Sequence, residues 1–279
     1  MTEGAIPKAG SALEASGEQT KLVLSTVVDG VARVSLNRPQ SLNALNKPLA
    51  QSLMDTFHEL EGDKRVRAVL LNGAGASFCV GGDLAAFNDE GERAPRYIKQ
   101  VVVFFHEVIS TISRMKAPVV AAVRGSAAGG GMALACACDI VIAAETARFV
   151  MAYTKVGLTP DGSSTWFLPR LVGLHRSLEL ALLNRELSAH TALNWGIIND
   201  VVADEDLDMK AFDIAARMAH GATEALGTAK KLIRESLETS LETQMMKEAV
   251  AVSRAMASRE AREGIDAFFA KRQPNFEET

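Results

Sequence analysis

Two short glycine-rich stretches each follow an apolar run that is typical of a buried strand. The first stretch is "VGGDL" (80–84), after "VRAVLLNG" (66–73), and the second is "GGGMALA" (129–135), after "APVVAAV" (117–123). Glycine inside a helix costs about 1 kcal/mol relative to alanine, so three in a row indicate a helix start, an unusual φ angle or a close approach to the backbone. The N–H groups and positive dipole end at such a helix start would stabilise an anion.

The glycines do not form a nucleotide-binding loop. The chain has no G-x-x-x-x-G-K-[ST] stretch here, and "GGG" lacks the G-x-G-x-x-G spacing with an acidic residue about 20 positions on. Close helix packing is the alternative explanation for the second stretch. Asp161, in "GLTPDGSS" (157–164), precedes a glycine and two serines, and its neighbours alone predict a helix N-cap.

Hydrophobic periodicity predicts an α/β fold that would position these residues. Residues 21–36 form two β-branched runs around an Asp29-Gly30 turn, which predicts a β-hairpin. Apolar residues at steps of three and four predict a helix over 49–60, behind Pro48. Strands are also expected at 66–73, 117–123 and 139–145, with a helix over 97–115.

From about Leu174 the chain is predominantly helical, with "WGIINDVV" (195–202) as one short interruption. No internal repeat or low-complexity linker marks an independent second domain. The expected organisation is therefore a mobile N-terminal tail over 1–19, a core domain over 20–205 and a C-terminal helical region over 206–279. The last of these is expected to act as a cap and an oligomerisation surface.

Composition limits the classes of protein that this chain can belong to. The net charge is -4 and the basic residues are dispersed, so nucleic acid is not an expected partner. No stretch of about 18 uncharged apolar residues occurs, so no membrane span is expected. The N-terminus resembles neither a secretion signal nor a transit peptide, which predicts a cytoplasmic protein. Cys136 and Cys138 lie in an apolar run without nearby histidines and are interpreted as core residues rather than metal ligands.

Five segments, in chain order, resemble the signature segments of the crotonase superfamily, the enoyl-CoA hydratase/isomerase family. They are "NRPQSLNAL", "SFCVGGDL", "VRGSAAGGGMALACACDIVIA", "GLTPDGSSTWFLPRLVG" and "REAREGIDAFFAKRQPNF". The resemblance implies an α/β fold, a crotonase-like spiral of ββα units, with a C-terminal helical trimerisation region. It also implies an acyl-CoA thioester as substrate, no other cofactor, no metal, and a homotrimer or a hexamer that is a dimer of trimers.

The same resemblance implies an oxyanion hole, in which two backbone N–H groups hold the thioester oxygen. These donors map to Gly82 and Gly130, and removing one such donor costs about 3 to 4 kcal/mol of transition-state stabilisation. In the hydratases of this family two glutamates hold and activate water, at the positions of Ala133 and Tyr153 here. Neither residue is a carboxylate, so the ordinary hydration mechanism is not expected. Both are expected at the substrate pocket, where Tyr153 either donates a hydrogen bond or lines the wall.

Asp161 occupies the position of the catalytic carboxylate in the enoyl-CoA, dienoyl-CoA and ring-epoxide isomerases of the family. We therefore predict an enoyl-CoA isomerase with Asp161 as its single catalytic carboxylate, acting on a double bond or a ring epoxide. Hydration of a 2-enoyl-CoA is the alternative. His106 falls where the 4-chlorobenzoyl-CoA dehalogenases carry a functional histidine, so dehalogenation is a remote alternative, as is CoA binding with little catalysis. His106 is otherwise explained as a packing residue on an apolar helix.

The resemblance also implies contacts with CoA. The family holds the adenine and pantetheine groups against backbone near the first hairpin and the first glycine-rich turn, at the positions of Asn43, Ala44, Val80, Asp83 and Leu84. Asp83 is also explained by the organisation of its own turn. The basic residue that meets the CoA phosphates would be Lys271 or Arg272, with Phe268 and Phe269 as pocket or packing aromatics.

Overall fold

The computed structural model describes residues 21–276, so the predicted tail over 1–19 lies outside the described residues. The strands are β1 (Val23–Val28), β2 (Val31–Leu36), β3 (Ala68–Gly73), β4 (Val119–Val123), β5 (Ser126–Ala128), β6 (Ile140–Ala144), β7 (Arg148–Val150), β8 (Leu187–Ser188) and β9 (Asp200–Val202). The α-helices are α1 (Lys47–Gly62), α2 (Leu84–Asp89), α3 (Ala94–Arg114), α4 (Gly130–Ala137), α5 (Ser164–Val172), α6 (Leu174–Leu183), α7 (Ala189–Asn194), α8 (Leu207–Ala219), α9 (Thr223–Ser236), α10 (Leu241–Met256) and α11 (Arg259–Ala270). The 3-10 helices are η1 (Pro39–Ser41), η2 (Gly91–Arg93) and η3 (Thr154–Val156).

The predicted hairpin and the predicted helices over 49–60 and 97–115 are confirmed. β1 and β2 pair antiparallel around Asp29 and Gly30, which have positive φ angles of 49° and 75°. Positive φ at both central residues matches the right-handed twist of the two strands, and Asp-Gly tolerates it. α1 begins after Asn46, whose side chain accepts a hydrogen bond from the Leu49 N–H and so caps the helix.

The main sheet has the order β1-β2-β3-β4-β6-β9, and all its neighbours from β2 onward are parallel. Alternate residues of its strands belong to two separate apolar clusters, because side chains alternate between the faces of a sheet. Val69 and Leu71 of β3 pack with α1 and α3, whereas Ala68 and Leu70 pack with α8. Helices therefore cover both faces, as a parallel sheet requires.

A second, small sheet has the order β5-β7-β8. Three strands of the main sheet are each followed by a segment that reaches this small sheet. After β3, Cys79 forms a β-bridge with Ala127; β4 is followed by β5, and β6 is followed by β7. A helix follows each such segment, namely α2, α4 and α5. Successive ββα turns are thus stacked as a spiral.

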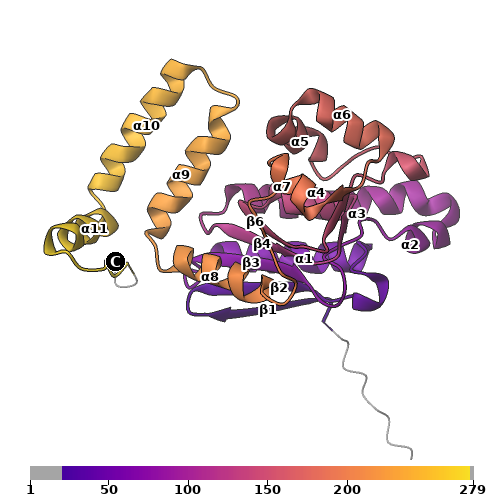
Figure 1. The fold of residues 1–279 in the computed structure, drawn as a ribbon, viewed down its shortest axis with the longest axis horizontal. Coiled ribbons are helices and arrows are strands. Elements are labelled where there is room, and N and C mark those ends of the chain that lie inside the picture. Colours follow the sequence, from indigo (N-terminus) through magenta and orange to yellow (C-terminus); the bar gives the residue numbers. More distant parts are fainter. Residues whose placement is uncertain (1–20, 277–279) are drawn as a thin grey trace, which may run out of the picture.

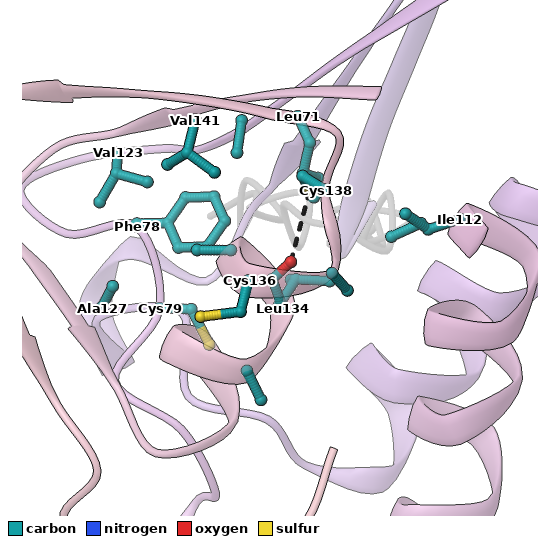
Figure 2. Close-up of a cluster of buried hydrophobic side chains, with 14 of the residues drawn as sticks. Leu71, Phe78, Cys79, Ile112, Val123, Ala127, Leu134, Cys136, Cys138 and Val141 are labelled. Carbon is teal, nitrogen blue, oxygen red and sulfur yellow. Dashed lines mark hydrogen bonds between the residues drawn. The ribbon is translucent and has the colours of Figure 1, made fainter. Parts of the chain in front are cut away.

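The three cysteines are part of the apolar core in and around α4. Cys136 and Cys138 lie beside Phe78, Leu71 and Val141, and every residue of α4 is buried (Figure 2). Burial raises the pKa of the Cys136 thiol to about 12. The thiols of this core are therefore protonated at neutral pH, and they act as small apolar side chains.

The C-terminal helices divide into one that packs on the body and three that project from it. α8 buries Leu207, Ala211, Ala215 and Ala219 against the main sheet, so the projecting part of the C-terminal helical region begins at α9. In Figure 1, α9, α10 and α11 extend to the left of the body. A buried ion pair between Lys230 and Asp139, at 2.7 Å, fastens α9 to the body. None of the helices within 21–276 combines the length and the apolarity needed to cross a membrane.

Candidate active site

The two glycine-rich stretches lie directly against each other. A Cβ added at Gly81 would lie 2.8 Å from the Ala128 carbonyl oxygen and 3.1 Å from the Gly130 nitrogen. Such distances leave no room for a side chain, so glycine is required for the close approach. We refer to Gly81–Gly82 and Gly129–Gly130 together as the oxyanion wall.

The oxyanion wall presents two unused N–H groups to one cavity. Gly130 is the first residue of α4, where a helix has no internal acceptor for the N–H. Gly82 lies between Gly81, whose carbonyl accepts from the Leu45 N–H, and Asp83, whose N–H donates to the Leu45 carbonyl. Within residues 21–276 neither the Gly82 nor the Gly130 N–H donates to an acceptor of the chain, and both glycines line the cavity. They can therefore donate to a bound oxyanion.

The cavity in front of the oxyanion wall has a volume of about 420 Å³ and is mainly apolar. Its wall includes side chains from the start of α2, the N-terminal half of α3 and the segment before α5. The apolar lining residues are Leu45, Val80, Leu84, Phe87, Ile98, Val101, Val102, Phe105, Ala152, Val156 and Leu158. Among the lining residues, Asp161 is the only acid and Lys155 the only base. The cavity can therefore hold an apolar acyl group beside one carboxylate.

Asp161 lies in the segment 151–163 between β7 and α5, which we call the acid loop. The Tyr153 hydroxyl donates a hydrogen bond of 2.5 Å to Asp161 Oδ1. Burial, and then the charge of the Asp161 carboxylate, raise the pKa of the Tyr153 phenol well above its usual range. The phenol therefore keeps its proton and acts as a donor.

The alternative explanation of Asp161 as a helix N-cap does not fit the geometry. The N-cap residue of α5 is Ser163, and no side chain caps this helix. The Asp161 backbone carbonyl accepts from the Ser164 N–H and hydroxyl, while the carboxylate faces the cavity and Tyr153. The carboxylate is thus available to a ligand rather than used by the helix.

His106 contacts the acid loop from α3. Its Nε2 accepts a hydrogen bond of 3.3 Å from the Gly162 N–H. Gly162 and Ser163 both have positive φ angles, of 59° and 61°, so this turn needs support from its surroundings. His106 is exposed and does not line the cavity, so the packing role expected for it is replaced by this hydrogen bond.

Ala133 is fully buried in α4 and is not among the lining residues. A Cβ added at Gly162 would lie 2.8 Å from the Ala133 Cβ, so the acid loop packs directly on this alanine. The structure therefore separates Ala133 from the cavity, contrary to the expectation that it lines the substrate pocket. Alanine at this position leaves space for Gly162 and supplies no carboxylate.

The residues expected near CoA are only partly brought together. Val80 and Leu84 line the cavity. Asn43 is fully buried, and its side chain forms hydrogen bonds to backbone atoms of the surrounding loops. Ala44 is also buried. Asp83 caps α2 and forms an ion pair of 2.9 Å with Arg38, so the side chains of Asn43 and Asp83 organise the turns and leave only backbone for a ligand.

The basic candidates at the C-terminus lie at the end of α11, in the projecting part (Figure 1). Lys271 is exposed, and Arg272 forms an ion pair of 2.6 Å with Glu263. Phe268 and Phe269 are 77% and 78% exposed. None of these four residues lines the cavity of the same chain.

Sequence reasoning missed the contribution of α3 to the cavity. Ile98, Val101, Val102 and Phe105 line it, whereas the sequence predicted only that a helix spans 97–115. The signal was present, because apolar residues extend to Val102 and Val103 and give a wider stripe than packing requires. The Tyr153–Asp161 pair could not be found by periodicity, because both residues lie in a loop.

Comparison with known proteins places the chain in a family. The family model for enoyl-CoA hydratase/isomerase matches residues 26–279. The 1,2-epoxyphenylacetyl-CoA isomerase of Escherichia coli (strain K12) is 41% identical over 257 residues, which cover 92% of this chain and 98% of that protein. The 4-chlorobenzoyl coenzyme A dehalogenase-2 of Arthrobacter sp is 33% identical over 216 residues, covering 77% and 78%.

Solved structures give the same result. An enoyl-CoA hydratase from Polaromonas sp. JS666 superimposes with a TM-score of 0.87 at 34% identity, covering 91% of this chain and 98% of that one. The chain therefore belongs to the enoyl-CoA hydratase/isomerase family, and it is an enzyme of that family with the crotonase fold. The predicted family and the predicted α/β spiral with C-terminal helices are confirmed.

Proposed function

We propose that this protein is an acyl-CoA isomerase that forms a thioester enolate between the Gly82 and Gly130 N–H groups and moves a proton with Asp161. The single observation that carries the proposal is that, among residues 21–276, Asp161 is the only carboxylate on a cavity that also presents both free N–H groups. Isomerisation needs one group that takes a proton and returns it elsewhere, which one carboxylate can do. The 41% identity to a 1,2-epoxyphenylacetyl-CoA isomerase supports the same reaction class.

In the double-bond case, Asp161 takes the proton from the α-carbon of a 3-enoyl thioester. The electron pair of that C–H bond moves into a dienolate, whose oxygen accepts hydrogen bonds from Gly82 and Gly130. Asp161 then returns the proton to the γ-carbon, and the double bond ends conjugated with the thioester. Substrate and product have the same atoms and electrons, so the proposed reaction needs no cofactor besides the CoA that the substrate carries.

Hydration is the competing function within the family. It needs a second group to deliver water while the first handles the α-proton. Ala133 and Tyr153 stand at the two hydratase positions, and in the described part of the chain no acid besides Asp161 lines the cavity. These facts support isomerisation over hydration, and the hydratase relatives in the family make hydration the outcome that must be tested beside it.

The proposed assembly is a trimer, or a hexamer made of two trimers, built through the projecting helices. α10 has no buried residue, and its apolar side chains are exposed, with Met246 at 71%, Val252 at 67% and Met256 at 65%. Exposed apolar surface of this extent marks an interaction surface. A second copy of the chain would cover it. Sedimentation at micromolar concentration should show no stable monomer, and a stable 29.8 kDa species would contradict the assembly.

The function is tested by incubating the protein separately with a 3-enoyl-CoA, crotonyl-CoA and an aromatic epoxide-CoA. Absorbance reports conjugation of a double bond, and mass reports addition of water. The proposal expects a product of unchanged mass from the 3-enoyl-CoA or the epoxide-CoA, and little hydration of crotonyl-CoA. Hydration of crotonyl-CoA as the fastest reaction would overturn it.

A further inference from the structure

Tyr153 lies between the oxyanion wall and Asp161. A Cβ added at Gly129 would lie 3.8 Å from Tyr153 Cζ, so the ring packs against the oxyanion wall. At its other end the hydroxyl donates to Asp161 Oδ1 at 2.5 Å. The side chain lines the cavity along with both partners. One aromatic side chain thus sets the position of the carboxylate relative to the backbone donors.

The two oxygens of the Asp161 carboxylate are not equivalent. Oδ1 accepts the Tyr153 hydrogen bond, whereas no residue within 21–276 donates to Oδ2. The aspartate side chain has a broad, soft torsion next to its carboxylate, so a fixed donor on one oxygen determines where the other points. Oδ2 is therefore the oxygen left for the substrate.

We propose that Tyr153 is a positioning residue that holds Asp161 through Oδ1, and that Oδ2 is the oxygen that takes and returns the substrate proton. The inference rests on the proposed isomerase function. The α-proton moves from carbon to Oδ2 and its electron pair enters the enolate. The phenolic proton stays on Tyr153, so the tyrosine is neither the acid nor the base.

The test compares the only two tyrosines of the chain. Tyr153→Phe removes the hydroxyl and keeps the ring. Tyr97→Phe is the matched control, because the Tyr97 hydroxyl accepts from the Lys47 N–H and does not line the cavity. A hydrogen bond to a charged group contributes about 1.5 to 3 kcal/mol, so kcat of Tyr153→Phe should fall about 10- to 150-fold. KM should change by less than about twofold, because the ring and the apolar wall remain.

Tyr97→Phe should keep both constants. A Tyr153→Phe variant with unchanged kcat, or with a raised KM at unchanged kcat, would overturn the positioning role. A loss of thermal stability equal in the two variants, with equal loss of kcat, would also overturn it.

A second measurement does not depend on turnover. In Tyr97→Phe, Tyr153 is the only tyrosine, so the tyrosine Fermi doublet in the resonance Raman spectrum reports its hydrogen bond alone. We expect the ratio of the intensities of the two lines of the doublet to be that of a phenol that donates a strong hydrogen bond. The ratio should change when Asp161→Ala is added to this variant. An intensity ratio that shows no hydrogen bond donated by the Tyr153 hydroxyl would overturn the inference. A donor doublet in a protein that isomerises no acyl-CoA would overturn the proposed function, and the role of Oδ2 with it, while leaving the hydrogen bond in place.

Discussion

The oxyanion wall and the acid loop face the same cavity but are built in different ways. The oxyanion wall consists of backbone atoms that are packed in the core, with little space for added side-chain atoms. For example, a Cβ on the adjoining Gly131 would lie 2.0 Å from the Cys79 carbonyl oxygen. The acid loop is exposed over residues 154–159, and its chemistry depends on side chains. The fold therefore fixes enolate stabilisation, whereas a few loop side chains decide what happens to the enolate.

This difference explains how one family contains isomerases, hydratases and dehalogenases, as the relatives named above do. Changing a donor of the oxyanion wall requires changing the backbone of α4 or of the turn at Gly82. Changing the group at position 153 or 161, both in the acid loop, requires one substitution. The following predictions test whether the two regions respond as differently as the structure implies.

The largest effect is expected from Gly130→Pro. Proline removes the N–H that donates to the oxyanion, and the first position of a helix otherwise tolerates proline. Loss of one donor should lower kcat by about 10²- to 10³-fold. Gly130→Ala is the control, because it keeps the N–H and meets the same neighbour, the flexible end of Leu45 at 3.0 Å. Steady-state assays of both variants should separate them, and equal activities would remove Gly130 from the oxyanion hole.

A smaller effect, on stability, is expected from Gly131→Ala. Its Cβ would meet the Cys79 carbonyl carbon at 2.7 Å as well as its oxygen, and neither atom can move without shifting the core. Overpacking of this kind lowers the free energy of unfolding by about 1 to 3 kcal/mol. Urea unfolding measures it, with Gly62→Ala as the control.

Gly62 ends α1 and has no atom within 4 Å of an added Cβ, so alanine there should be neutral or stabilising by up to about 1 kcal/mol. Equal unfolding free energies for the two variants would show that the oxyanion wall is as adaptable as the surface, and would remove the contrast drawn above.

The smallest effect is expected from His106. His106→Leu removes the acceptor of the Gly162 N–H, and a neutral hydrogen bond contributes about 1 kcal/mol, so kcat should fall about fivefold. His106→Gln can place an amide oxygen near Nε2 and should restore most of the rate. If both variants instead lose more than about 100-fold, His106 takes part in the chemistry, as a dehalogenase-like reaction would require.

The sequence predicts best the elements that carry a strong period. The Asp29-Gly30 hairpin, α1, β3 and α3 all follow from alternation or from steps of three and four. β5, β7 and β8 contain two or three residues each, too few to show alternation, and they form only because the spiral stacks distant segments. Ala133 was placed at the pocket by resemblance, whereas the packing of Gly162 on it depends on tertiary contacts that no local pattern contains.

The part of the site that is formed by backbone N–H groups could be predicted from the sequence, whereas the arrangement of its side chains could be predicted less well. Glycines after a strand indicate free N–H groups whatever their neighbours. The asymmetry of the Asp161 oxygens depends on a tyrosine eight residues earlier, on the other side of a turn, and becomes visible only in the structure.

The central claim is that Asp161 is the proton carrier of an isomerase, and Asp161→Asn tests it most directly. Asparagine keeps the size of the side chain and an Oδ1 that can accept from Tyr153, but it cannot take up the α-proton. The thermal midpoint and the affinity for CoA should therefore be unchanged, while the isomerase rate falls at least about 100-fold. Isomerase activity that survives in Asp161→Asn, or a crotonyl-CoA hydratase activity that persists in it undiminished, would contradict the account.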